Sequence, residues 1–118
     1  MDSERTSARA GICGRLAPVF NDRLLCTDIP ERFARDASMF SLHPLAVAEA
    51  HDETEVAVAV RAAGAAGVPL VVRAGASNTG GAAITDGLLL TLHGAPFDRV
   101  DVDPRSGLAV CGPAVRHD

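Results

Sequence analysis

Residues 74–83, "AGASNTGGAA", have the composition of a loop that binds a phosphate group through its backbone. No side chain in this stretch is larger than that of asparagine. Small residues let successive N–H groups turn toward one point, where they form a nest for an anion. Ser77, Asn78 and Thr79 add side-chain donors, and Arg73 places a positive charge at the loop entrance. The stretch is longer than a tight turn requires, although its composition alone leaves a plain connection between strands open.

Two common phosphate loops are excluded by individual residues. Gly75 and Gly80 have the Walker A spacing, but Gly81 stands where the lysine is required and Ala82 where the magnesium ligand is required. The dinucleotide fingerprint GxGxxG needs a glycine at position 77, which is serine. The loop is also followed by a strand-like segment rather than a helix. The sequence therefore predicts a phosphate or nucleotide loop of another kind.

The segments on either side of the loop predict how it is held. The apolar runs "LVVR" and "GLLLTL" predict buried strands before and after it. Residues 52–67 predict a helix, with Asp52 as N-cap, Glu55 completing a capping box and Gly67 as the stop. The alternation in "VAVAV" would suit a strand, but the two ends favour the helix.

The remaining segments predict further helices, a strand and a hairpin. Residues 1–10 are expected to be a flexible tail, so that the domain spans residues 11–118. Residues 12–24 have helical spacing interrupted by Pro18, and a short helix follows from Pro30 to about Asp36. "LAVA" predicts a strand, and "VDVDPRSGLAV" predicts a hairpin with its valines in the core and its aspartates in solvent. The fold class is α+β, a small mixed sheet with flanking helices.

Composition narrows the classes of partner. The chain has 118 residues and a net charge of −4, and its eleven basic residues form no stripe that would suit nucleic acid. No apolar run is long enough to cross a bilayer. Three cysteines without metal-ligand spacing predict reduced thiols in a cytoplasmic protein. The histidines have no partner at a catalytic or metal-binding spacing, so no catalytic residue and no metal site are predicted.

The order of the motifs resembles a known family. "RFARDASMF", "HPLAVAEA", "GVPLVVRAGASNTGGAA", "DGLLLTL" and "FDRVDVDPRSGLAVCGPAV" are similar to the N-terminal part of the FAD-binding domain of FAD-linked oxidases. This is the vanillyl-alcohol oxidase and p-cresol methylhydroxylase superfamily, with its PCMH-type domain. The D-lactate dehydrogenase and glycolate oxidase D-subunit branch is the most similar. The resemblance covers roughly residues 32–115.

The resemblance implies FAD binding within an oxidoreductase that acts on 2-hydroxy acids. The family's loop wraps the FAD diphosphate, which implies a cofactor site made by Arg73, Ala74, Gly75, Ala76, Ser77, Asn78, Gly81 and Ala82. The loop contains no histidine, so the flavin is expected to be non-covalent. If Ala74 or Ala76, which stand where glycine is usual, needed a positive φ, each would cost about 1 kcal/mol.

The resemblance also implies an incomplete domain. Members of the family continue after the segment that corresponds to "CGPAV", and a substrate domain supplies their catalytic residues. The isolated chain is therefore expected to be inactive alone, with the missing C-terminal half or a separate substrate-domain chain as its partner. Two alternatives remain: a non-catalytic remnant or interaction module that binds no flavin, and a phosphate-binding module for another nucleotide.

Overall fold

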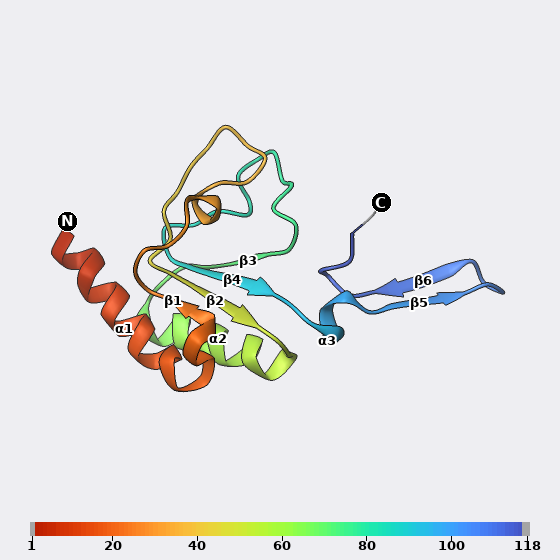
Figure 1. Cartoon of the computed structure of the whole chain (residues 1–118), viewed down its shortest axis with the longest axis horizontal. Coiled ribbons are helices and arrows are strands. Elements are labelled where there is room, and N and C mark those ends of the chain that lie inside the picture. Colours follow the sequence, from red (N-terminus) through yellow and green to blue (C-terminus); the bar gives the residue numbers. More distant parts are fainter. Residues whose placement is uncertain (1, 117–118) are drawn as a thin grey trace.

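A four-stranded mixed sheet forms the centre of the computed structural model, which describes residues 2–116 (Figure 1). Strands β2 (Ala46–Ala50), β4 (Leu88–Leu92) and β3 (Leu70–Arg73) run parallel, and β1 (Leu24–Leu25) pairs antiparallel with β2. The order across the sheet is β1-β2-β4-β3. The prediction of a small mixed sheet is confirmed. Residue 1, in the expected tail, and residues 117–118, at the end of the expected domain, lie outside the described residues.

Helices α1 (Asp2–Phe20) and α2 (Glu53–Ala66) cover one face of this sheet, as Figure 1 shows. Ala46 of β2 pairs with Leu88 of β4, and Ala48 pairs with Leu90. Because side chains alternate along a strand, these four residues point to the same face of the sheet. Small side chains on β2 and α2 allow close packing, while leucines, Ile12 and Phe20 supply the bulk. The core they form contains Ile12, Leu16, Phe20, Ala46, Ala48, Ala50, Ala59, Ala63, Leu88 and Leu90.

Helix α2 begins and ends at the residues that the sequence predicts. Asp52 Oδ1 accepts a hydrogen bond from the Glu55 amide at 2.8 Å, and Gly67 closes the helix with φ of 65°. Glu55 also anchors the 3₁₀ turn η1 (Asn21–Arg23), since both its oxygens lie 2.6 Å from the Arg23 guanidinium. These two hydrogen bonds lower the pKa of Glu55 to about 2. The predicted helix is therefore confirmed and is tied to the N-terminal segment.

The prediction of a flexible tail at residues 1–10 is wrong, because residues 2–20 form a single helix. Side chains far along the chain hold its first half. Arg5 donates to the carbonyl of His43 at 3.1 Å, and Arg9 donates to that of Leu45 at 2.8 Å. Pro18 does not divide the helix. Pro18 lies in the last turn of the helix. The backbone hydrogen bond that it cannot donate is therefore lost close to the helix end, and few helical residues follow it.

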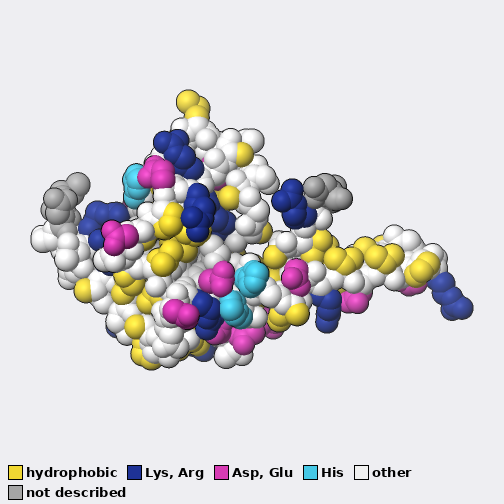
Figure 2. Space-filling view, in the orientation of Figure 1, with side chains coloured by type: hydrophobic (Ala, Val, Ile, Leu, Met, Phe, Trp, Pro, Cys, Tyr) yellow, Lys and Arg dark blue, Asp and Glu magenta, His cyan; other side chains and the backbone are white. Residues whose placement is uncertain are grey.

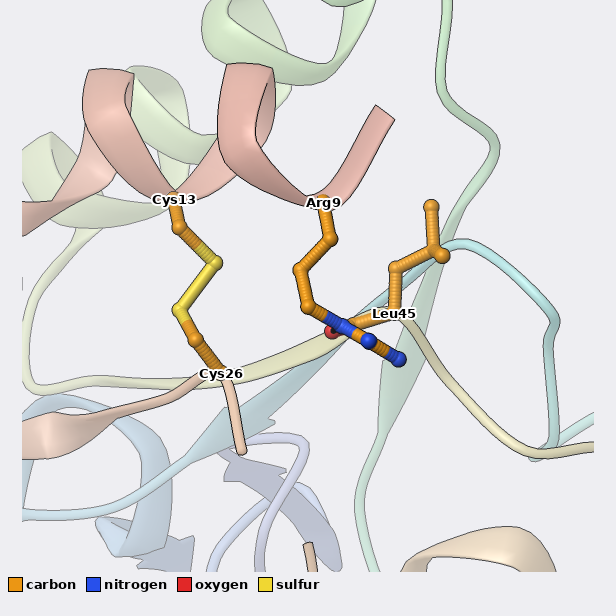
Figure 3. The surroundings of a disulfide bond; sticks show 4 residues. All are labelled: Arg9, Cys13, Cys26 and Leu45. Carbon is orange, nitrogen blue, oxygen red and sulfur yellow. Dashed lines mark hydrogen bonds between the residues drawn. A yellow bond between two sulfur atoms is a disulfide. The ribbon is translucent and has the colours of Figure 1, made fainter. Parts of the chain in front are cut away.

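The prediction of three reduced cysteines is also wrong, because Cys13 and Cys26 form a disulfide (Figure 3). Cys13 lies on α1, and Cys26 directly follows β1. The packing of the helix against the sheet brings their Cα atoms to 6.5 Å, within the range that a disulfide spans. Cys111 is a free, exposed thiol.

The C-terminal hairpin projects away from the sheet (Figure 1). It consists of β5 (Val100–Asp103) and β6 (Leu108–Cys111), preceded by the one-turn helix α3 (Ala95–Asp98). The expected core positions are wrong here, since Val100 is 51% exposed and Val102 66%. Because these valines pair with Cys111 and Ala109, one face of the hairpin is wholly apolar. Figure 2 shows hydrophobic side chains along it.

The segment before β2 and the loop after β3 cover the face of the sheet opposite the helices. The helix expected from Pro30 to Asp36 is a shorter 3₁₀ turn, η2 (Glu31–Ala34). Val47 and Leu89, which point to this face, are 3% and 0% exposed. Strands β2 and β4 are therefore buried on both faces, as strands of parallel sheets usually are, whereas Val72 on the edge strand β3 is exposed. No helix within residues 2–116 is long and apolar enough to cross a membrane.

Candidate functional site

Residues 74–87 connect two neighbouring parallel strands without a helix. Such strands need a long crossover, and here an irregular loop of small residues takes that place. Loops of this length without regular structure are commonly functional. The strand–loop–strand arrangement predicted from the sequence is therefore confirmed, and it places the glycine-rich segment at the carboxyl end of β3.

The first half of the loop faces the C-terminal segment across a pocket of about 460 Å³. Ala74, Gly75 and Ser77 form one wall. Pro113, Ala114, Val115 and Arg116 form the other. Arg116 is the charged residue among these described lining residues, and the small side chains of the first wall leave its backbone open to a ligand. The residues on the second wall were not predicted as site residues, although the motif "CGPAV" contributes to the family resemblance.

Backbone hydrogen bonds fix the second wall. The Gly112 amide donates to the carbonyl of Arg99 at 2.9 Å, and the Ala114 amide donates to that of Phe97 at 2.8 Å. Phe97 of α3 is 5% exposed and serves as the anchor. The chain that leaves the hairpin is therefore held against α3, the short helix before the hairpin, and from there it reaches the loop. This connection explains how residues so far apart in sequence share one pocket.

The second half of the loop faces a different hollow. Gly81 lines a space of about 290 Å³ with Gly80, Ile84 and the segment from Phe40 to Leu42. Gly81 has φ of 85°, and a Cβ there would lie 3.2 Å from the Phe40 ring. The structure thus separates the predicted site residues into two groups. Ala74, Gly75 and Ser77 lie at the pocket, and Gly81 lies away from it.

Asn78 organises the turn between these two groups. Its Oδ1 accepts hydrogen bonds from the amides of Gly80 at 2.7 Å and Ala82 at 3.0 Å. The side-chain oxygen therefore occupies the position that an anion would take at these two N–H groups. Its NH₂ group, a donor only, is the part of the side chain with capacity for a ligand.

Arg73 turns inward, although it was predicted as a diphosphate contact. Its side chain is 6% exposed and donates to the backbone carbonyls of Ala83, Arg32 and Arg35, the first two at 3.2 and 2.9 Å. Burial lowers the pKa of Arg73, and the negative charge of Asp36 opposes this effect. These contacts join both ends of the loop to η2.

Ala76 adopts a left-handed conformation with φ of 57°, whereas Ala74 is not among the residues with positive φ. The cost of a positive φ, which the sequence left open for both alanines, therefore applies to Ala76 and not to Ala74. We expect Ala76→Gly to raise the free energy of unfolding by about 1 kcal/mol in urea titrations. Ala74→Gly should lower it by about 0.5 kcal/mol, because there glycine only adds freedom to the unfolded chain. Equal effects of the two substitutions would contradict this assignment of strain.

Known proteins resemble this chain in sequence family and in fold. The family model described as "FAD binding domain" matches residues 44–118, more than half of the chain. A xylooligosaccharide oxidase from Myceliophthora thermophila C1, solved with xylobiose, aligns with a TM-score of 0.67 and 19% identity over 92% of this chain and 24% of that one. An Acremonium strictum glucooligosaccharide oxidase aligns with a TM-score of 0.67 and 22% identity, over 90% and 22%.

A third solved structure, an alkyldihydroxyacetonephosphate synthase, aligns with a TM-score of 0.61 and 19% identity over 80% of this chain and 21% of that one. At these identities the likeness shows the fold. The chain spans about a quarter of the length of these structures. No curated protein sequence matches it closely enough to count as a relative. The predicted fold and the FAD cofactor are confirmed, and the 2-hydroxy acid branch stays a prediction.

Proposed function

Because this chain belongs to the FAD-binding domain family of FAD-linked oxidases, we propose that its pocket between residues 74–77 and 113–116 holds the FAD diphosphate. The observation that carries the proposal is the coincidence of three features in one place. The pocket has a wall of small residues, a left-handed turn at Ala76, and an arginine, Arg116, among its described lining residues.

The predicted site residues take different roles in this proposal. The backbone from Ala74 to Ser77 faces the diphosphate, and Ser77 and the Asn78 NH₂ group can donate to it. Gly81 and Ala82 shape the loop, with the Ala82 amide held by Asn78. The flavin is non-covalent at this loop, because the loop contains no histidine. When bound, FAD would supply the capacity to accept a hydride.

We propose further that this site serves an oxidoreductase that acts on 2-hydroxy acids. The support is the sequence resemblance to D-lactate dehydrogenases and glycolate oxidase D-subunits. A partner polypeptide or domain would supply the substrate site, and the apolar face of β5–β6 offers it a surface. In a complete flavoprotein, anaerobic bleaching of the flavin by D-lactate or glycolate tests the substrate class. Bleaching by xylobiose instead would overturn it.

The cofactor proposal is tested by Gly75→Val. A side chain at Gly75 meets nothing within 4 Å, so the variant should fold, yet it would project into the diphosphate site. We expect the wild-type chain to quench flavin fluorescence on titration with FAD, and ADP to compete. Gly75→Val should weaken both ligands at least tenfold.

The matched control is Gly14→Val, on the exposed side of α1 with no atom within 4 Å. It should bind FAD like the wild type. Unchanged binding by Gly75→Val would place the flavin elsewhere. A wild-type chain that does not respond to millimolar FAD would favour the alternative function, an interaction module that binds no flavin.

A further inference from the structure

The peptide groups on both sides of Ala83, at the far end of the loop, are held by two charged side chains. The carbonyl of Ala83 accepts a hydrogen bond from Arg73 Nε at 3.2 Å. The amide of Ala83 donates to Asp36 Oδ2 at 3.3 Å. Ala83 itself is 7% exposed. We call Arg73, Asp36 and Ala83 the loop clamp.

The loop clamp closes the loop into a ring. Arg73 is the last residue of β3 and Ala83 lies ten residues later, so a single side chain joins the beginning of the loop to its end. Arg73 also donates to the carbonyl groups of Arg32 and Arg35. These contacts fix the loop to η2.

Asp36 ties a third segment to the same point. Its Oδ1 accepts a hydrogen bond from the Ser38 amide at 2.8 Å, while Oδ2 reaches Ala83. Hydrogen bonds from Ser38 and Ala83 hold the pKa of Asp36 below its usual value, so it is ionised at neutral pH. Both oxygens of one carboxylate therefore bridge the segment before β2 and the loop after β3.

We propose that Arg73 and Asp36 are positioning residues for the diphosphate and do not contact it. The inference rests on the proposed function, since it assigns these residues to that same site. A loop whose amides bind an anion gives high affinity only if it is ordered before the ligand arrives. Residues 74–83 have no regular structure of their own, so the loop clamp supplies that order from outside.

The direction in which FAD affinity changes when Asp36 is substituted distinguishes a positioning role from a simple effect of its charge. Asp36 is an anion bound to the same loop as a proposed anion site, so removing its charge would by itself strengthen binding or leave it unchanged. Positioning requires the opposite result. We expect Asp36→Ala to weaken FAD and ADP about tenfold. Asp36→Asn should recover much of the loss, because its amide oxygen can still accept from Ala83 or Ser38.

Asp86→Ala is the matched control. Asp86 is an exposed aspartate near the end of the same connection between β3 and β4, outside the loop clamp. The variant should bind FAD as well as the wild type or slightly better. Arg73→Met should weaken binding as Asp36→Ala does, but it removes a buried cation. Asp36→Ala is the decisive variant because Asp36 is only partly buried.

Hydrogen exchange supplies an independent measurement. In Asp36→Ala, the amides of residues 75–83 should exchange at least tenfold faster, whereas those of Leu88–Leu92 should keep their protection. A wild-type chain that fails to bind FAD would contradict the proposed function. A wild-type chain that binds, with Asp36→Ala binding equally or more tightly, would overturn the positioning role alone.

Discussion

Gly87→Val is expected to lower the free energy of unfolding by about 3 kcal/mol or more, in urea titrations at neutral pH. Gly87 directly precedes β4, and a Cβ atom there would overlap the carbonyl oxygen of Pro69. That oxygen cannot move freely, since it accepts a hydrogen bond from the Leu88 amide at 2.8 Å. Any side chain at position 87 therefore forces β3 away from β4.

The consequences should reach the proposed cofactor site, because β3 and β4 carry the loop. The Gly87 carbonyl also accepts a hydrogen bond from the Leu45 amide at 2.8 Å, so a displacement would affect the start of β2 as well. A loss of this size is a large part of the 5–15 kcal/mol by which domains are usually stable. We expect Gly87→Ala to show most of the effect, since its Cβ alone makes the overlap.

Gly64→Ala is the matched control. Gly64 lies inside α2 with no atom within 4 Å of a Cβ, so alanine should raise the stability by about 0.5–1 kcal/mol through helix propensity. The two glycines thus predict effects of opposite sign. If Gly87→Ala stayed within 0.5 kcal/mol of the wild type, the close approach of Pro69 to Gly87 would be contradicted.

Local signals account for what the sequence predicts well. The ends of α2 are determined by Asp52 and Gly67 through contacts with their immediate neighbours, so they can be recognised without any tertiary structure. The loop is recognisable because its small residues lie together between two apolar runs. Its FAD assignment depended on the order of several motifs, which composition alone does not supply.

Contacts between distant segments account for what the sequence did not predict. The first turns of α1 are ordered by the carbonyls of His43 and Leu45, which lie 38 and 36 residues from the arginines that bind them. The inward turn of Arg73 depends on carbonyls of η2, and the second wall of the pocket depends on Phe97. None of these pairings has a periodic or local pattern that could indicate it.

Reduction of the disulfide between Cys13 and Cys26 is expected to lower the free energy of unfolding by about 3 kcal/mol, the usual effect of closing a loop of this length. Cys13→Ser with Cys26→Ser should reproduce the loss, measured by urea unfolding without reductant. Cys111→Ser should have no effect, because Cys111 is exposed and unpaired. A double variant as stable as the wild type would show that the bond contributes nothing.

The buried side chains of α1 determine what reduction leaves intact. Ile12, Leu16 and Phe20 are each 0% exposed, so the helix should remain on the sheet after the bond is broken. Neither cysteine lines the pocket that we propose for the diphosphate, so the FAD affinity of the folded chain should be unchanged.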